Sequence, residues 1–407
     1  MTTFVIVGGG LAGAKAAEAL RDGGFDGELV LFGSEPERPY ERPALSKGYL
    51  LGKDTRDSVF VHSADWYPEH KVDLRTGVTV AMIDPAAHLV TFAGGTLGYD
   101  KLLLATGSSA RRVDLPGAGL GNVLYLRTLP ESDALREAFT PDARVVIVGA
   151  GWIGLEAAAA ARTAGASVTV LEPQPTALYR VLGPELGEKF ARLHRSHGVE
   201  FRFEESAAEF RAAGPGSDRV GTVVTTAGAE LPADVVVVGI GVTPNVGLAE
   251  SAGLEVGNGV VTDSALRTSD PDIFAAGDVA SSYVPLLGRH LRVDHWSNAL
   301  NGGKAAGYSM LGQQVEYNRV PYFYSDQYDL GMECAGLPSP GTYDQVVYRG
   351  DSDALEFIAF WLNEGKLVAG MNVNIWDVND DIQSLIRTAK PLDPIRLSDP
   401  AVPLSEV

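Results

Sequence analysis

The sequence predicts an α/β protein that contains two βαβ units and a further α+β domain. The pattern Val7-Gly8-Gly9-Gly10-Leu11-Ala12-Gly13 ends an apolar run at residues 4–7 and precedes an Ala-rich helical stretch at residues 14–20. The same order recurs at Val148-Gly149-Ala150-Gly151-Trp152-Ile153-Gly154, between an apolar run at 145–148 and a helical stretch at 155–162. Because a strand, a glycine turn and a helix follow one another twice, we expect two similar parallel-sheet domains.

Each glycine pattern has the chemistry of a dinucleotide site. In G-x-G-x-x-G, the first Gly permits a tight turn, the second lets the backbone approach a pyrophosphate, and the third lets the helix pack on the strand. A second strand follows each pattern and leads to an acid, Glu35 or Glu172, whose carboxylate can accept hydrogen bonds from a ribose. The sequence therefore predicts two bound dinucleotides, and the alternative is a glycine-rich turn without a ligand.

Composition excludes several classes of protein. The net charge of −19 disfavours nucleic acid and anionic membrane surfaces as partners. No apolar stretch approaches the roughly 20 residues of a membrane span, and no signal segment is evident, so we expect a cytoplasmic protein. Cys334 is the only cysteine, which rules out an intrachain disulfide and any metal or iron–sulfur site built on several thiolates. Its apolar surroundings are typical of a buried, inert thiol. We expect no metal site.

The order of elements predicts nested domains. Residues 111–121 are rich in Pro and Gly, which indicates a linker. Residues 273–278 indicate that the chain re-enters the first domain. We expect the first dinucleotide domain at residues 1–110 and 241–318, and the second at 111–240. Alternating strands after residue 321 and a helix at 378–388 predict a C-terminal α+β domain at 319–407.

Five short motifs give the chain a family resemblance, and it covers essentially the whole sequence. They are Arg42-Pro43-Ala44-Leu45-Ser46-Lys47, Ala105-Thr106-Gly107, Gly154-Leu155-Glu156, Ile273-Phe274-Ala275-Ala276-Gly277-Asp278 and Tyr324-Ser325-Asp326-Gln327. With them the chain resembles the FAD-containing, NADH-dependent ferredoxin reductases of the putidaredoxin reductase and Rieske oxygenase type, although the family more often has Pro where Ala44 stands. The resemblance implies a glutathione-reductase-like architecture, in which a Rossmann-like FAD domain and a Rossmann-like NAD domain precede the C-terminal domain.

The resemblance also implies the site residues. For FAD they are Gly8, Gly10, Ala12, Gly13, Ser34, Glu35, Arg42, Lys47, Val80, Ala105, Thr106, Gly107, Arg127, Gly277, Asp278 and Trp296. For NAD(H) they are Gly149, Gly151, Ile153, Gly154, Glu156, Glu172, Arg180 and Gly241.

Several of these residues also have a simpler interpretation. Asp278 can accept a ribitol hydroxyl or can be a helix N-cap. Trp296 opens a helix whose N–H groups could face the flavin, or it is ordinary core. Taken alone, Arg42 and Arg127 would be surface charges. Glu172 should favour NADH by repelling a 2′-phosphate, and the neighbouring Arg180 tempers that preference.

Lys47 and Glu156 are the expected catalytic pair. The family places this Lys beside flavin N5, with the Glu close enough to pair with it. A cation there favours the negative charge that develops as hydride arrives, and the carboxylate orients the cation. The alternative is a purely structural ion pair.

These observations predict an enzyme that passes electrons from NADH through FAD to a separate 2Fe-2S ferredoxin serving a monooxygenase or a Rieske oxygenase. Two alternatives stay open. One is an NADH oxidase or quinone reductase, and the other is a redox-sensing flavoprotein that resembles apoptosis-inducing factor.

Overall fold

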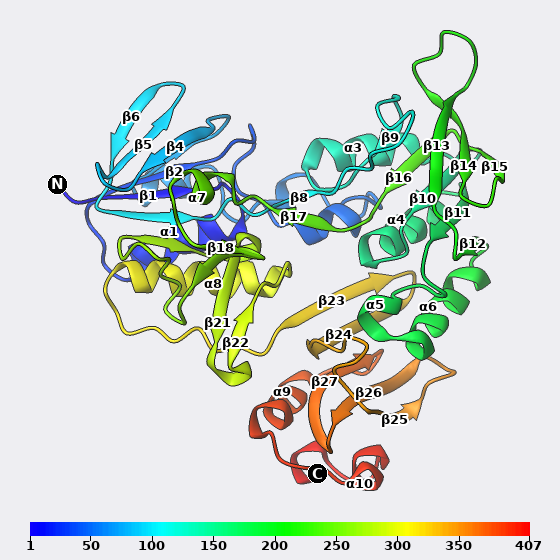
Figure 1. Cartoon of the computed structure of the whole chain (residues 1–407). Helices are drawn as coiled ribbons and strands as arrows, with labels where there is room; N and C mark the ends of the chain where they lie inside the picture. The colour runs from blue at the N-terminus through cyan, green and yellow to red at the C-terminus, as the bar shows by residue number, and fades with distance from the viewer. The chain divides into compact units, whose positions relative to one another are not determined.

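The computed structural model describes all 407 residues, and they divide into two compact units (Figure 1). Unit 1 contains Met1–Arg42, Arg56–Ser109 and Val242–Pro321. Unit 2 contains Pro43–Thr55, Ala110–Gly241 and Tyr322–Val407. The chain leaves unit 1 through β8 (Ser108–Ala110) and returns through β17 (Val242–Pro244), and these two strands pair with each other. Residues 110–241 of unit 2 therefore lie in the sequence between two segments of unit 1.

A parallel sheet forms the centre of unit 1. Its strand order is β20-β7-β1-β2-β3. The strands are β1 (Thr3–Val7), β2 (Glu28–Phe32), β3 (Val72–Arg75), β7 (Lys101–Leu104) and β20 (Ile273–Ala275). Strands β2 and β7 pair with β1 on its two sides. Its side chains are buried on both faces of the sheet, because Phe4 and Ile6 belong to one apolar cluster and Val5 and Val7 to another. The first predicted βαβ unit is confirmed.

Helices α1 (Leu11–Asp22) and α8 (Trp296–Met310) pack closely in unit 1. A Cβ added at Gly303 would lie 2.3 Å from the carbonyl oxygen of Ala12, and one at Gly307 would lie 2.8 Å from that of Ala16. Glycine on one helix facing alanine on the other therefore allows the two backbones to approach.

Smaller elements complete unit 1. They are a three-stranded antiparallel sheet, β4 (Val80–Asp84), β5 (Leu89–Phe92) and β6 (Gly95–Gly98); a four-stranded sheet, β18 (Val256–Gly257), β19 (Gly259–Thr262), β21 (Ala280–Val284) and β22 (Arg289–Leu291); helices α2 (Trp66–Glu69) and α7 (Gly247–Ser251); and the 3₁₀ turns η2 (Asp57–Val59), η3 (Gly277–Val279) and η4 (Pro285–Leu287).

A second parallel sheet, with the order β12-β11-β10-β16-β9, lies in unit 2. Its strands are β9 (Val123–Leu124), β10 (Arg144–Val148), β11 (Ser167–Glu172), β12 (Val199–Phe203) and β16 (Val235–Val238). The helices of this region are α3 (Leu129–Ala138), α4 (Trp152–Thr163), α5 (Tyr179–Leu182) and α6 (Pro184–Ser196). The second predicted βαβ unit is confirmed, whereas α3 was not foreseen.

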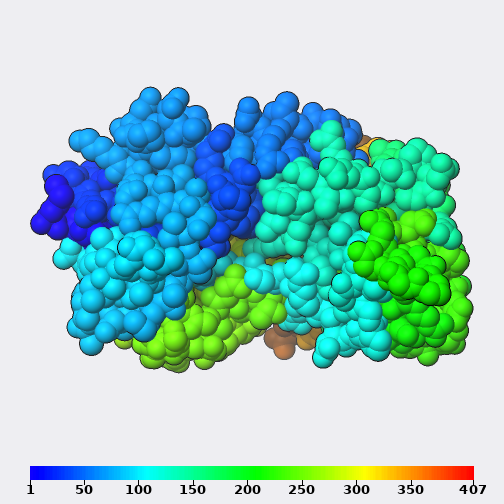
Figure 2. All heavy atoms as spheres, turned by 90° about the horizontal axis from the view of Figure 1, so that it is seen from above, coloured from blue at the N-terminus to red at the C-terminus, as the bar shows by residue number.

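An antiparallel hairpin system packs against the predicted linker in unit 2. Its strands are β13 (Ala207–Ala212), β14 (Val220–Thr225) and β15 (Glu230–Pro232). The backbone N–H of Phe210 donates to Pro116, and that of Val220 donates to Gly121. Figure 2 shows residues 110–121 in cyan beside these strands in green. The segment at 111–121 is irregular, as predicted, but backbone hydrogen bonds hold it in place.

The C-terminal part of unit 2 is α+β. Its antiparallel sheet has the order β23-β24-β27-β26-β25, and the elements are β23 (Tyr322–Gln327), β24 (Leu330–Gly336), β25 (Gln345–Asp351), β26 (Glu356–Asn363), β27 (Lys366–Val373), α9 (Asn379–Thr388), α10 (Pro394–Ser398) and the 3₁₀ turn η5 (Leu404–Glu406).

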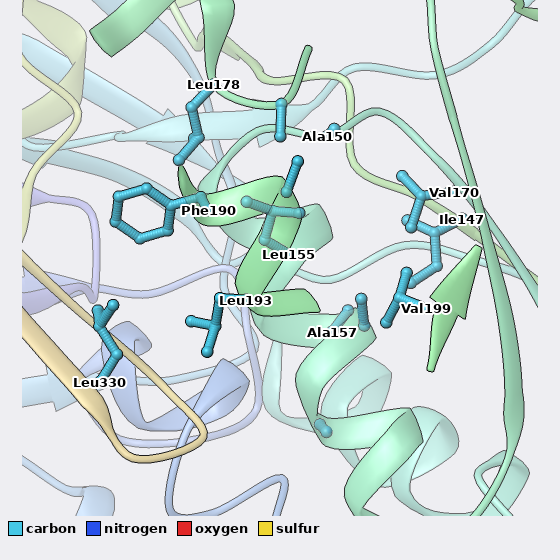
Figure 3. Packing of buried hydrophobic residues seen from close by; sticks show 14 of the residues in the cluster. Ile147, Ala150, Leu155, Ala157, Val170, Leu178, Phe190, Leu193, Val199 and Leu330 are labelled. Atoms are coloured by element: carbon cyan, nitrogen blue, oxygen red, sulfur yellow. The ribbon is translucent and has the colours of Figure 1, made fainter. Parts of the chain in front are cut away.

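One apolar core runs through unit 2. It joins Ile147 on β10, Leu155 on α4, Phe190 on α6 and Leu330 on β24 (Figure 3). The parallel sheet, two of its helices and the C-terminal sheet are therefore packed into one body. Thus the predicted fold class is confirmed. None of the helices is long and apolar enough to cross a membrane.

Candidate nucleotide sites and a buried ion pair

The first glycine turn in unit 1 is built as the motif predicts. Gly8 has φ of +132°, and a Cβ there would lie 2.0 Å from the carbonyl oxygen of Ala105. A Cβ at Gly13 would lie 2.1 Å from the oxygen of Gly8, so both positions require glycine. A Cβ at Gly10 would meet no atom within 4 Å. Gly10 is also the N-cap of α1, which has no side-chain cap and no acid in its first turn. Open space beside an uncapped helix N-terminus fits a pyrophosphate.

The second glycine turn, in unit 2, repeats this arrangement. Gly149 has φ of +103°, and a Cβ there would lie 2.5 Å from the carbonyl oxygen of Gly239. A Cβ at Gly154 would lie 2.0 Å from the oxygen of Gly149, whereas one at Gly151 would meet nothing within 4 Å. Gly151 caps α4 without a side-chain hydrogen bond or an acid in the first turn. Each unit therefore has one cradle that suits a dinucleotide.

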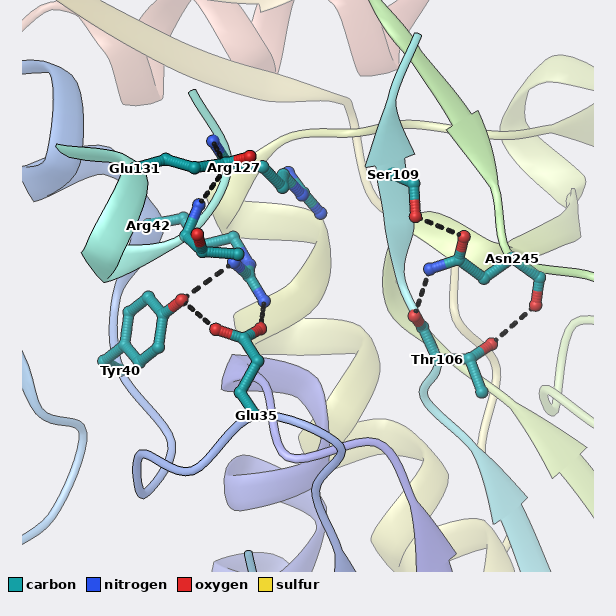
Figure 4. A network of polar contacts seen from close by, with 9 residues as sticks. Glu35, Tyr40, Arg42, Thr106, Ser109, Arg127, Glu131 and Asn245 are labelled. Atoms are coloured by element: carbon teal, nitrogen blue, oxygen red, sulfur yellow. Dashed lines mark hydrogen bonds and ion pairs between the residues drawn. The ribbon is translucent and has the colours of Figure 1, made fainter. Parts of the chain in front are cut away.

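Glu35 follows β2 and lies in a small polar network (Figure 4). Arg42 Nη2 donates to Glu35 Oε1 at 2.6 Å, and the hydroxyl of Tyr40 donates to Oε2. Arg42 Nη1 lies 3.0 Å from the Tyr40 hydroxyl. The structure therefore brings together two residues that the sequence assigns to FAD, and it adds Tyr40, which the sequence reasoning missed.

Asp278 and Trp296 are two further residues of unit 1 that the resemblance assigns to FAD. Asp278 is 8% exposed and lies inside the 3₁₀ turn η3, where it caps no helix, so the N-cap interpretation is wrong. Ser108 Oγ donates to Asp278 Oδ2 at 3.2 Å. Trp296 begins α8, as predicted, and is half-buried. Its indole Nε1 donates to Glu41 Oε2 at 3.1 Å, so it is not purely apolar core.

Asn245 holds the Thr-Gly turn after β7, a role that no sequence motif indicates. Its side-chain Nδ2 donates to the carbonyl oxygen of Thr106 at 2.8 Å, while Thr106 Oγ1 donates to the carbonyl oxygen of Asn245 at 2.8 Å. Ser109 Oγ donates to Asn245 Oδ1, also at 2.8 Å (Figure 4). The reciprocal bonds hold the backbone on either side of Gly107, whose φ is +67°.

Glu172, the last residue of β11, is hydrogen-bonded to the second glycine turn. Its Oε2 accepts from the backbone N–H of Ala150 at 2.8 Å, and its Oε1 accepts from that of Gln174 at 3.0 Å. The carboxylate is therefore held beside the cradle, and each oxygen keeps further lone pairs for a ribose hydroxyl.

Lys47 and Glu156 form the ion pair that the sequence predicts. Lys47 Nζ lies 2.8 Å from Glu156 Oε1, and the two side chains are 14% and 2% exposed. Lys47 follows the 3₁₀ turn η1 (Arg42–Ser46), and Glu156 lies in the second turn of α4. Lys47 Nζ also lies 5.2 Å from the centre of the Tyr324 ring. Burial raises the pKa of Asp326, and the Glu156 carboxylate adds to the rise against the opposing effect of Lys47.

The remaining predicted residues vary in exposure. Val80 and Ala105 are buried in unit 1, and Ser34 is exposed. A Cβ added at Gly277 would lie 3.0 Å from the Cβ of Ala12, which places these two predicted residues together. In unit 2, Ile153 and Arg180 are exposed, Gly241 has φ of +95°, and the backbone N–H of Arg127 donates to Glu131.

Cys334 lies on β24 with no exposed surface. Burial raises the pKa of its thiol, so the reactive thiolate is disfavoured. The predicted burial of Cys334 is confirmed, and as the only cysteine it cannot form a dithiol within this chain.

Comparison with known proteins places this arrangement in a family. The family model described as pyridine nucleotide-disulphide oxidoreductase matches residues 2–303, and the reductase C-terminal model matches residues 322–407. The chain is 42% identical over 403 residues to the ferredoxin–NAD(+) reductase component of an anthranilate 1,2-dioxygenase system from Burkholderia cepacia, covering 98% of each chain. It is 36% identical to putidaredoxin reductase from Pseudomonas putida, covering 99% of this chain and 96% of the relative.

A solved structure agrees with these relatives. The crystal structure of a covalent putidaredoxin reductase–putidaredoxin complex matches with a TM-score of 0.95 at 35% identity, covering 100% of this chain and 97% of the other. Members of this group use FAD and NAD(H), which fits the two cradles. The chain therefore belongs to the pyridine nucleotide-disulphide oxidoreductase family and, within it, to the ferredoxin–NAD(+) reductases.

Proposed function

We propose that this enzyme takes electrons from NADH onto FAD and passes them singly to a separate 2Fe-2S ferredoxin of an oxygenase system. The observation that carries the proposal is the buried Lys47–Glu156 ion pair in a chain without a reactive thiol. The names of the relatives, reductase components for a dioxygenase and for putidaredoxin, support a ferredoxin as the acceptor. We also propose a cytoplasmic location. The proposed domains are an FAD domain at residues 1–110 and 241–318, an NAD domain at 111–240 and a C-terminal domain at 319–407.

The residues of unit 1 are proposed to hold FAD. Gly8, Gly10 and Gly13 shape the turn for the pyrophosphate, and Glu35 and Asp278 present carboxylates for hydroxyl groups. Bound FAD supplies the conversion of a two-electron donor into single-electron steps. The protein supplies binding, orientation and the local charge.

Lys47 is proposed to stabilise the negative charge that develops during reduction by NADH. A preorganised cation acts most strongly where water is excluded, and Lys47 is largely buried. Glu156 fixes the position of the ammonium group, since it accepts directly from Nζ. Glu172 is proposed to select NADH, because its charge disfavours a 2′-phosphate.

The Lys47 proposal is tested by anaerobic single-turnover reduction at saturating NADH. Lys47→Met should lower the rate of flavin reduction by roughly ten- to a hundredfold, as expected for the loss of one electrostatic group, while FAD stays bound. Glu156→Gln keeps the shape but not the charge of the partner, and it should have a smaller effect. If both variants reduce at the parent rate, the pair is only structural.

The alternatives predict different acceptors. An NADH oxidase or a quinone reductase would turn over rapidly with oxygen or quinone alone, and a sensor that resembles apoptosis-inducing factor would turn over slowly with every acceptor. Steady-state oxidation of NADH should be slow in air and should rise with the concentration of an added 2Fe-2S ferredoxin. Rapid turnover in air without ferredoxin would contradict the proposal.

A further inference from the structure

A chain of buried polar side chains reaches Glu156 inside unit 2. His194 Nε2 lies 2.7 Å from Gln327 Oε1, Gln327 Nε2 donates to Ser325 Oγ at 3.0 Å, and Ser325 Oγ donates to Glu156 Oε1 at 2.6 Å. Their residues are 0%, 1%, 0% and 3% exposed in that order. Helix α6, strand β23 and helix α4 each contribute to this chain.

All the hydrogen bonds of this chain point toward Glu156. The Gln327 amide nitrogen donates to Ser325, so its oxygen faces His194, and His194 Nε2 must carry the proton. His194 Nδ1 is then the acceptor, and the Tyr328 hydroxyl lies 3.4 Å from it. Burial lowers the pKa of His194 to about 4, so the ring is neutral at pH 7. Its single N–H proton then lies on Nε2. Aligned hydrogen bonds polarise one another, and here they favour negative charge on Glu156.

Ser46 and Lys47 complete the surroundings of the carboxylate. Ser46 Oγ donates to Glu156 Oε2 at 2.5 Å, and Lys47 Nζ donates to Oε1 at 2.8 Å. A buried carboxylate is strongly disfavoured unless it is paired and hydrogen-bonded, and Lys47 alone satisfies only part of its acceptor capacity. The two serines therefore satisfy further acceptor positions of Glu156 and fix its orientation.

We propose that Ser325, Gln327 and His194 are positioning residues for the reaction with NADH: they hold Glu156 so that it keeps the Lys47 ammonium group in place. This inference rests on the proposed function of Lys47. It also gives a role to the Tyr324-Ser325-Asp326-Gln327 motif, which lies in the C-terminal sheet and more than 100 residues from both Lys47 and Glu156 in the sequence. The competing interpretation is that these side chains only satisfy one another's hydrogen-bonding groups in the protein interior and have no effect on the reaction.

The first test compares two small deletions in the same sheet. Ser325→Ala removes one donor to Glu156, and Cys334→Ala removes a buried thiol on the neighbouring strand β24 that has no bond to this chain. Ser325→Ala should lower the rate of flavin reduction at saturating NADH by roughly three- to tenfold, the size expected for a typical single hydrogen bond, because Ser325 acts only through Glu156. The dissociation constant for NADH and the FAD content should not change. Cys334→Ala should reduce at the parent rate.

Gln327→Met and Lys47→Met extend this comparison. Gln327→Met interrupts the chain without touching Glu156, and it should slow reduction in the same direction as Ser325→Ala. Parent rates for both Ser325→Ala and Gln327→Met, with Lys47→Met slow, would overturn the positioning role and leave the proposed function intact. A parent rate for Lys47→Met would overturn both.

A second measurement does not depend on activity, and the protonation state is read from the parent protein. In ¹⁵N-histidine-labelled protein, the NMR signals of His194, assigned by their loss in His194→Gln, should show the neutral Nε2–H tautomer and should not titrate between pH 5.5 and 8. A His194 ring that titrates in this range, or that carries its proton on Nδ1, would overturn the proposed direction of the chain.

Discussion

Three glutamates that the sequence assigned to nucleotide sites have different surroundings in the structure. Glu35 contacts Arg42 and Tyr40, Glu172 accepts from two backbone N–H groups, and Glu156 is buried among hydroxyls and Lys47. The glycine patterns located Glu35 and Glu172 because both follow a strand at a fixed distance from the turn. The partners of Glu156 come from distant parts of the chain, so no local pattern contains them.

Glu172 should set the coenzyme preference. Glu172→Ala is expected to narrow the preference for NADH over NADPH by roughly ten- to a hundredfold, since about 1.4 kcal/mol of differential binding corresponds to tenfold. The change also removes the hydrogen bond to Ala150, so Glu172→Gln is the control, because it keeps an acceptor and removes the charge. The ratio of specificity constants measures the preference, and an unchanged ratio in both variants would contradict the assignment.

His194 should make stability depend on pH. Its pKa is about 4 in the folded protein and about 6.5 when the chain is unfolded, so below pH 6.5 the unfolded chain binds a proton that the native state does not bind until about pH 4. The free energy of unfolding should therefore fall between pH 6.5 and 4, by about 2 kcal/mol at pH 5 from this group.

Burial lowers the pKa of His295 in the same way, so both histidines should contribute to the pH dependence of stability. The variant His194→Gln separates the contribution of His194, because it retains His295. Denaturant unfolding of both proteins at pH 7.5 and pH 5 should show a smaller loss of stability in the variant. Equal losses would mean that His194 does not remain neutral in the native state.

At the scale of elements, the two strand–glycine–helix units were predictable because each is encoded within about 20 residues. The pairing of Ser167–Glu172 with the preceding strand follows from the same local order. Helix α3 was missed, although Thr128 and Glu131 form a capping box and Pro130 lies in the first turn. The contacts of Asn245 with Thr106 and of Ser325 with Glu156 span more than 130 residues, and only the folded chain brings these groups together.

The glycine turn of unit 1 permits a matched pair of substitutions. Gly8→Ala should lower the melting temperature of the FAD-free protein, because its Cβ would overlap the Ala105 carbonyl and φ is +132°. Gly10→Ala should leave that temperature nearly unchanged and weaken FAD binding, because its Cβ would extend only into open space. Calorimetry of the FAD-free proteins and titration with FAD separate the two effects. Normal FAD affinity in Gly10→Ala would show that the open space is not the pyrophosphate site.

At the scale of the whole molecule, each unit contains its own glycine cradle, and unit 2 also contains the Lys47–Glu156 pair. The segment Pro43–Thr55, which carries Lys47, belongs to unit 2 although its neighbours on both sides belong to unit 1. Because this segment belongs to unit 2, Lys47 contacts Glu156 on helix α4 of the second βαβ unit. Sequence periodicity cannot reveal it, because the segment is short and largely irregular.

The central claim is that electrons pass from NADH through FAD to a one-electron ferredoxin, and their stoichiometry tests it most directly. The protein, loaded with FAD, is mixed without oxygen with a limiting amount of NADH and an excess of oxidised 2Fe-2S ferredoxin, and both absorbance changes are followed to completion. A two-electron donor and a one-electron acceptor require about two ferredoxins reduced for each NADH oxidised. NADH oxidation that leaves a panel of such ferredoxins oxidised would contradict the account.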